Sequence, residues 1–220
     1  VVLLPGLQGD PEIFRPLLPF LPEDRSVWRV RFTVRGAAED ARCLVEALEQ
    51  NGVVGADLIC GSYGGQVALM LQASLRSIVL TASFPQYRTL SARARLSLLR
   101  SLGMPGGILG FLYRQSLKGR LLRDGVDVST ANAVTPPSGA ALQARLDSLR
   151  DLGSDSDEGV ALLWLMGMED TSVTWLESDM RMAWPQVQVQ RVAGGHRPYA
   201  SHPKIFADVV SRWWLSMETQ

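Results

Sequence analysis

A serine flanked by glycines is the residue whose type and context most clearly predict chemistry. Residues 57–69 read DLICGSYGGQVAL, an apolar stretch that enters the turn Gly61–Gly65 and is followed by a second apolar stretch. A strand that turns sharply into a helix presents its serine hydroxyl at the end of a sheet, and the turn requires small neighbours. Cys60 stands where the common motif has glycine, and it is also small. The pattern predicts that Ser62 is a nucleophile.

A glycine-rich turn between a strand and a helix can instead bind a phosphate without doing chemistry. The P-loop form of such a turn needs a Lys-Ser/Thr pair after the glycines, and the dinucleotide-binding form needs Gly-x-Gly-x-x-Gly. This segment has neither pattern. The nucleophile interpretation is therefore favoured, and it depends on partners elsewhere in the chain.

The chain contains two histidines, so there are few candidates for a general base. His196 lies in the loop GGHRP that follows the last expected strand, whereas His202 lies in the first turn of the final expected helix. An acid should come between the serine and the histidine in the chain. The expected strand 162–166 ends in Gly-Met-Glu-Asp, which makes Asp170 the first choice and Glu169 the second. We expect His196 to take the proton of Ser62 and Asp170 to orient the imidazole.

Acyl transfer through such a triad also needs an oxyanion hole built from backbone N–H groups. One donor is expected at Tyr63, the residue after the nucleophile. The other is expected from the glycine-containing loop after the first strand, with Leu7 preferred over Gln8. An acyl-enzyme would form on Ser62 and then be hydrolysed by water.

Strand-like and helix-like segments alternate along the chain, which predicts an α/β fold: a mostly parallel sheet with helices on both faces. Residues 84–158 break the alternation and are predicted to form an inserted helical lid between two parts of the core, 1–83 and 159–220. Strands are expected at 1–4, 27–33, 57–61, 77–82, 162–166 and 187–193, and helices at 14–21, 38–50, 64–73 and 201–214.

Bulk composition excludes several classes of protein. The 220 residues carry 22 basic and 22 acidic side chains, so the chain lacks the overall positive charge of a nucleic-acid binder. No apolar segment is long enough for a transmembrane helix. Cys43 and Cys60 are expected to be buried, reduced thiols, which fits a cytoplasmic location. No metal-ligand cluster or dinucleotide motif is seen, so no cofactor is expected. The sequence begins inside an expected strand without an initiator Met, which suggests a trimmed or incomplete start.

Four segments together resemble the landmarks of the α/β-hydrolase superfamily. They are LPGLQG at 4–9, GSYGG at 61–65, GMED at 167–170 and GGHRP at 194–198, and they occur in the superfamily's order. The Pro-Gly opening is similar to that of thioesterase-type members, and more loosely to that of maspardin-like proteins, in which the fold serves protein binding. Ser62 argues against the dehalogenase-type members, whose nucleophile is Asp. The resemblance implies several strands before the first motif, where this sequence shows at most one.

Every charged residue from Arg88 to Arg123 is basic, and apolar residues are interleaved with them. The segment could be an amphipathic lid with a solvated basic face, or a docking face for an acidic partner, an anionic substrate or a membrane surface. One hypothesis is that small-molecule acyl substrates arrive on an anionic carrier, which Arg93, Arg95 and Arg100 would bind.

Two functions therefore stand side by side. The first is a serine hydrolase of carboxylic esters or thioesters, with amide and carbon–carbon bond cleavage also compatible with the triad. The second is a non-catalytic protein-interaction module on the same fold. The sequence does not fix the substrate or the oligomeric state.

Overall fold

A computed structural model describes residues 1–219 except 34, 72–74, 84–105, 149–158 and 172–176. Within these ranges six strands form one parallel sheet in the order β2-β1-β3-β4-β5-β6. The strands are β1 (Val2–Leu4), β2 (Trp28–Arg29), β3 (Ala56–Gly61), β4 (Leu75–Thr81), β5 (Ala161–Gly167) and β6 (Gln188–Val192). The helices are α1 (Ala37–Gln50), α2 (Tyr63–Leu69), α4 (Gly106–Arg123), α5 (Val128–Ala133), α6 (Gly139–Ser148), α7 (Glu177–Ala183), α8 (Pro198–Ser201) and α9 (Pro203–Glu218).

The two faces of the sheet are covered by different helices, because successive side chains of a strand point to opposite faces. Leu58 and Cys60 of β3 pack with α1, α2 and α7 in one apolar core, whereas Ile59 packs with α9 in the other. Trp164 of β5 joins the first core and Leu163 the second. The predicted α/β class, a parallel sheet with helices on both faces, is confirmed.

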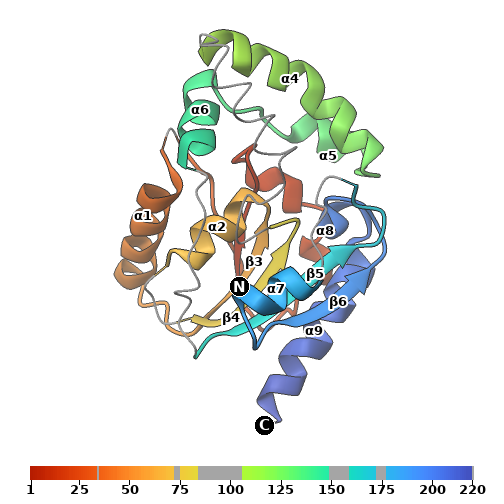
Figure 1. Cartoon of the computed structure of the whole chain (residues 1–220). Helices are drawn as coiled ribbons and strands as arrows, with labels where there is room; N and C mark the ends of the chain where they lie inside the picture. The colour runs from red at the N-terminus through yellow and green to blue at the C-terminus, as the bar shows by residue number, and fades with distance from the viewer. Residues whose placement is uncertain (34, 72–74, 84–105, 149–158, 172–176, 220) are drawn as a thin grey trace.

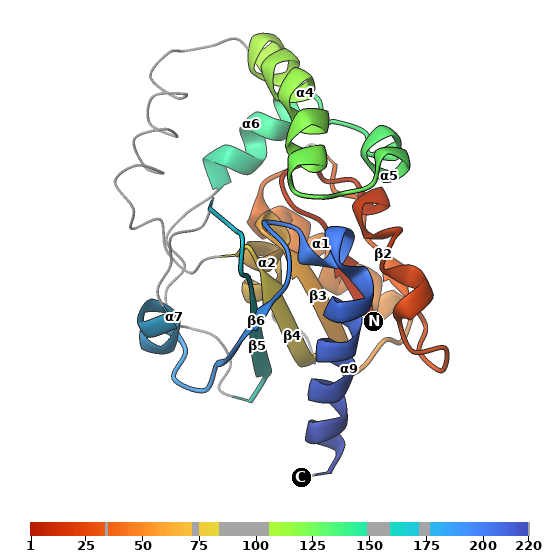
Figure 2. The same ribbon diagram turned by 90° about the vertical axis from the view of Figure 1, so that its right-hand side faces the viewer.

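The segment from α4 to α6 lies in the chain between β4 and β5. Figures 1 and 2 show these helices together at one end of the molecule, with the C-terminus at the opposite end. Residues 84–105 and 149–158, which complete the predicted lid, lie outside the described residues, and so do Arg93, Arg95 and Arg100. None of the described helices has both the length and the apolar character needed to cross a bilayer.

Several predicted elements differ in detail from the structure. The expected strand 27–33 is only the two-residue β2, and the expected helix 14–21 is replaced by two 3₁₀ helices, η1 (Pro11–Phe14) and η2 (Leu18–Phe20). Prolines recur through 11–22, and a proline lacks the N–H that a helix interior needs. Cys60 is buried as predicted, whereas Cys43 is only partly buried; both are free thiols.

The final predicted helix is divided into α8 and α9. His202 separates them with φ −132° and ψ 55°, a conformation outside the helical region. A residue that precedes proline is disfavoured in the helical conformation, and Pro203 follows here. His202 rather than Ser201 therefore stands at the N-terminus of the last helix.

Candidate active site

Ser62 occupies a backbone conformation that residues other than glycine rarely adopt. Ser62 lies between β3 and α2, and its backbone angles are φ 49° and ψ −110°. Such a conformation costs about 1–3 kcal/mol and persists only where the surroundings enforce it. The Ser62 N–H donates to Thr81 O at 2.8 Å, and Ser83 Oγ donates to Ser62 O at 3.0 Å. Both peptide groups of the strained residue are thereby tied to the end of β4.

Glycines allow the chain to crowd around this turn. A Cβ on Gly64 would collide with the carbonyl oxygens of Leu4 and Pro5. A Cβ on Gly6 would lie only 3.4 Å from Cβ of Ser62. The loop after β1 therefore packs directly against Ser62.

Asp170 and His196 lie in loops that leave the carboxyl ends of the neighbouring strands β5 and β6. Backbone hydrogen bonds join the two loops: Met168 N donates to Val192 O at 2.9 Å, and Glu169 N to Gly194 O at 3.0 Å. A Cβ on Gly167 would collide with Gly195 O, so the close approach of the two segments requires glycine here. The close approach of these loops brings the predicted acid and histidine together.

His196 Nδ1 lies 3.0 Å from Asp170 Oδ2. Their side chains are 16% and 9% exposed, so the pair is largely shielded from water. When the carboxylate accepts from Nδ1–H, the imidazole is held in the tautomer whose Nε2 accepts a proton. Glu169, the second choice for the acid, is exposed, and its backbone N–H donates to Gly194 O of the histidine loop.

Leu7 lies in a tight turn closed by a hydrogen bond from Gly9 N to Gly6 O at 2.9 Å. Its carbonyl accepts from Arg145 Nη1 of α6 at 2.6 Å. Arg145 is 1% exposed, and its Nη2 also donates to Phe32 O and Thr33 O, each at 2.9 Å. One buried guanidinium thus ties α6 to the loops after β1 and β2.

Tyr63 is the first residue of α2, where a backbone N–H has no partner within the helix. Its phenol donates to Asp40 Oδ2 of α1 at 2.8 Å, and the ring is 1% exposed. Burial raises the pKa of Asp40, although Tyr63 and Arg145 oppose the shift. Burial and the neighbouring Asp40 both raise the pKa of the Tyr63 phenol, which therefore stays protonated. The hydrogen bond fixes the residue that follows Ser62.

Arg145 and Asp40 were not identified from the sequence. A signal exists for Asp40, which shares the buried side of α1 with Ala37, Ala41 and Leu44. Arg145 likewise falls among the buried positions of α6, next to Leu142 and Leu146. A charged residue at an apolar helical position indicates a buried polar partner, although the partner itself is not visible in the sequence.

Among the cavities lined by the described residues, two lie at opposite ends of the sheet. One, of about 590 Å³, adjoins His196 and is also lined by Arg120, Arg123, Arg197, Asp124 and Glu169. Among the described residues, no group of three or more His, Cys, Asp or Glu side chains could hold a metal ion.

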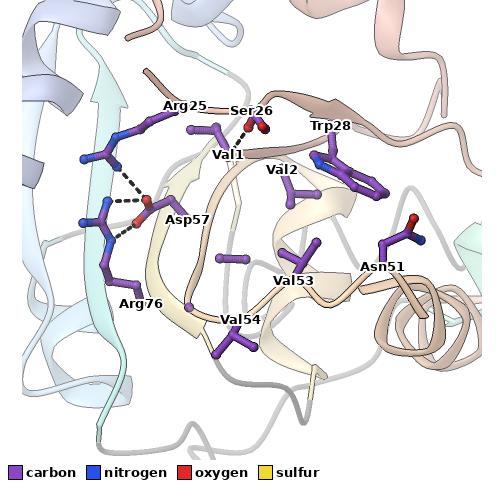
Figure 3. A pocket seen from close by; sticks show the side chains of 12 residues that line it. Val1, Val2, Arg25, Ser26, Trp28, Asn51, Val53, Val54, Asp57 and Arg76 are labelled. Carbon is purple, nitrogen blue, oxygen red and sulfur yellow. Dashed lines mark hydrogen bonds and ion pairs between the residues drawn. The ribbon is translucent and has the colours of Figure 1, made fainter. Parts of the chain in front are cut away.

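The other cavity, of about 520 Å³, is shown in Figure 3 at the start of β1, β3 and β4. There Arg25 and Arg76 both point to Asp57, with Arg25 Nη1 2.7 Å from Asp57 Oδ2. Asp57 also accepts from Ser77 Oγ at 2.5 Å, and Ser77 accepts from Trp214 Nε1 of α9 at 3.0 Å. The carboxylate therefore links the strands to α9.

The parallel sheet, the strained serine turn and the joined acid and histidine loops are the features of an α/β-hydrolase. The model of the alpha/beta hydrolase family matches residues 1–209, and the chain belongs to that family. No curated protein matches the chain.

Solved structures share the fold at low sequence identity. A carboxylesterase of Nitrososphaera gargenis superposes with a TM-score of 0.74 at 13% identity, over 99% of this chain and 90% of that one. The enol-lactonase of Burkholderia xenovorans has a TM-score of 0.74 at 15% identity, over 97% and 90%. A bromoperoxidase of Bacillus anthracis has a TM-score of 0.75 at 15% identity, over 97% and 91%. Because these proteins carry different activities, the shared fold does not define the reaction.

Proposed function

We propose that this protein is a serine hydrolase that cleaves carboxylic esters or thioesters through an acyl-enzyme. The observation that carries the proposal is the hydrogen bond of 3.0 Å between His196 and Asp170 at the same edge of the sheet as the strained Ser62. Membership of the alpha/beta hydrolase family supports hydrolytic activity, and the esterases among the structural neighbours support an ester substrate.

In the proposed mechanism Ser62 Oγ attacks the carbonyl carbon of the substrate while His196 Nε2 takes its proton. Asp170 accepts from Nδ1–H and stabilises the imidazolium that forms. The imidazolium then gives its proton to the departing alcohol or thiol, which leaves the acyl group on Ser62. Water, activated by His196, hydrolyses this intermediate and restores the free serine.

The tetrahedral intermediates would place their oxyanion near the backbone N–H groups of Leu7 and Tyr63. Both residues are held by buried contacts, Leu7 through Arg145 and Tyr63 through Asp40. Donors that are fixed before the reaction need no reorganisation as negative charge develops, and this fixed arrangement is the source of their catalytic effect. We further propose that residues 84–158 act as the lid over this site.

The protein-interaction alternative would be favoured by a histidine loop turned away from the acid. The hydrogen bond between His196 and Asp170 argues against that arrangement. The strained conformation of Ser62 argues in the same direction, because backbone strain of this kind gathers at functional sites.

Steady-state hydrolysis of p-nitrophenyl butyrate and of butyryl-N-acetylcysteamine tests the proposal. Ser62→Ala and His196→Ala should abolish turnover of both, and Asp170→Asn should lower kcat by about 10⁴-fold. Glu177→Gln, which changes an exposed acid on α7, is the matched control and should retain activity. If Glu169→Gln lost as much activity as Asp170→Asn, the assignment of the acid would be wrong. Equal rates in wild type and Ser62→Ala would refute the nucleophile.

A further inference from the structure

The cavity beside His196 has a wall rich in arginine that the proposed triad does not use. Arg120 and Arg123 come from the last turn of α4, and Arg197 follows the histidine directly. Arg197 forms an ion pair with Asp124, and both side chains are largely buried. That pair is neutral overall, so Arg120 and Arg123 supply the remaining positive charge.

Arg120 is held in place without an acidic partner among the described residues. Its Nη2 donates to Ser116 Oγ at 2.8 Å, and its guanidinium lies 4.7 Å from the centre of the Tyr113 ring. Its Nε is buried and has no hydrogen-bond partner in the described part of the chain. A guanidinium fixed by a ring and a hydroxyl keeps donors for a further group, and guanidinium donors match phosphate and carboxylate oxygens.

Arg123 lies one turn further along α4, at the exposed rim of the same cavity. Across the ranges that the structure covers, it too has no carboxylate within ion-pair distance. Glu169 also lines the cavity and is exposed to solvent. It forms no ion pair with the described residues. An anion that enters the cavity therefore meets two arginines and one screened carboxylate.

The proposed mechanism determines which part of the substrate reaches this cavity. His196 takes the serine proton and then gives it to the departing oxygen or sulfur, so the leaving group must lie beside the imidazole. The acyl group stays on Ser62. His196 lines this cavity and Ser62 does not, so the cavity is placed to hold the part of the alcohol or thiol that extends past the imidazole, away from the scissile bond.

We propose that Arg120 and Arg123 form a subsite for a phosphate or carboxylate carried by the leaving alcohol or thiol. This inference rests on the proposed function and narrows it to esters or thioesters with an anionic leaving group. When the acyl bond breaks, the proton on His196 passes to the departing oxygen or sulfur. The alcohol or thiol then leaves with its anionic group still ionised, and water completes hydrolysis of the acyl-enzyme.

Two matched substrate pairs test the subsite. The first pair is butyryl-coenzyme A and butyryl-N-acetylcysteamine, which share the acyl group and the thioester but differ in the remainder of the thiol, including the phosphates that coenzyme A carries. The second pair is 3-carboxyphenyl butyrate and 3-carbamoylphenyl butyrate, which differ in one carboxylate. The ratio of kcat/KM for the charged and neutral members is compared among variants, so that differences in intrinsic reactivity cancel.

Arg120→Gln should lower this ratio by about tenfold, and Arg123→Gln by about threefold because its side chain is more exposed. Both losses should appear in KM rather than kcat. Arg114→Gln, on an exposed turn of α4 outside the cavity, is the matched control and should leave the ratio unchanged. A loss confined to the coenzyme A pair identifies a phosphate-bearing thiol, and a loss confined to the aryl pair identifies a carboxylate.

An unchanged ratio in both arginine variants, for both pairs, would overturn the subsite while leaving the hydrolase intact. Calorimetric binding of the same four compounds to Ser62→Ala provides a readout that does not depend on turnover. If no compound is hydrolysed but Ser62→Ala binds the charged members through Arg120, the subsite stands and the proposed function fails. If Ser62→Ala binds charged and neutral members equally, the subsite is refuted.

Discussion

At the scale of single residues, the buried Arg145 has contacts with the candidate site that its position in the sequence does not reveal. It donates to three backbone carbonyls from a site that is 1% exposed. Burial lowers the pKa of its guanidinium, although Tyr63 and Asp40 oppose the shift. A buried charge is stabilised by the groups to which it is hydrogen-bonded, and Nη1 and Nη2 of Arg145 make such bonds. Here one of them holds Leu7, the expected oxyanion donor.

Replacing Arg145 should therefore affect catalysis as well as stability. Arg145→Met leaves three backbone carbonyl oxygens, one buried and two partly buried, without their donor and should lower the free energy of unfolding by about 2–4 kcal/mol. It should also lower kcat on p-nitrophenyl butyrate by about tenfold to a hundredfold with little change in KM, because Leu7 is no longer held for the transition state. Urea denaturation and steady-state kinetics measure the two effects.

Arg145→Lys is the companion variant, since it keeps the charge and one or two hydrogen bonds. It should recover part of kcat and part of the stability. A well-folded Arg145→Lys that loses stability but keeps the full kcat would show that the arginine is only structural.

The candidate site residues could be anticipated from the sequence to different extents. Ser62, Asp170 and His196 could be named because each follows an expected strand. Their order in the chain is also the order of nucleophile, acid and histidine in α/β-hydrolases. The strain at Ser62 could be anticipated from its flanking glycines. The roles of Arg145 and Asp40 could not, because their partners are backbone carbonyls and a phenol that are distant in sequence. Leu7 O, for example, is 138 residues from Arg145.

At the scale of elements, Asp10 connects the loop after β1 to the segment between α5 and α6. Its Oδ1 accepts from Glu12 N at 3.1 Å, where it caps η1, and its Oδ2 accepts from Thr135 N at 2.7 Å. Arg31 adds an ion pair at 3.0 Å. Burial would raise the pKa of Asp10, but the backbone donors at Glu12 and Thr135 outweigh it and the pKa is lowered.

The pH dependence of stability follows from that direction. Because the folded-state pKa is lowered, the carboxylate contributes stability above its unfolded pKa of about 4, and this contribution is lost as the pH falls through the folded value. Asp10→Asn keeps one acceptor oxygen in place of two and should cost about 1–2 kcal/mol at pH 7. The difference between wild type and variant should shrink below about pH 4.

Urea denaturation at neutral and acidic pH measures this difference. The exposed Asp24 supplies the matched control, and Asp24→Asn should change stability little at either pH. A destabilisation by Asp10→Asn that is equal at both pH values would contradict the role of the charge.

The strands were predicted more accurately than the connections between them. β1, β3, β4 and β5 are apolar on both faces and stood out as short apolar segments, as expected for a sheet covered on both sides. β2 is a two-residue strand at the sheet edge, and its length depends on pairing with β1 rather than on its own sequence. The division of the last helix depends on the backbone at His202, which the sequence indicates only through the following proline.

At the scale of the whole molecule, the two ends of the sheet have distinct roles. At the carboxyl ends of the strands lie Ser62, His196, Asp170 and the cavity lined by arginines. At the amino ends, Asp57 is saturated by Arg25, Arg76 and Ser77 and connects the strands to α9. Ligands of parallel α/β proteins bind outside the carboxyl ends of the strands, which is where the candidate site lies.

Fold class was predictable at this scale because alternating strands and helices allow few arrangements. The sheet order was not, since it depends on which strands each crossover helix brings together. The sequence shows basic residues throughout 88–123, but it does not show which of them lie near His196. The structure shows that Arg120 and Arg123 line the same cavity as His196.

Labelling with a fluorophosphonate probe tests the central claim, an activated Ser62, most directly. The probe reacts covalently with a serine whose hydroxyl is made nucleophilic by a neighbouring base. We expect labelling of the folded wild type, a modified peptide that contains Ser62 in mass spectrometry, and loss of labelling in Ser62→Ala and His196→Ala. A folded wild type that remains unlabelled, or a label that persists in Ser62→Ala, would contradict the account and favour a protein-interaction role for the fold.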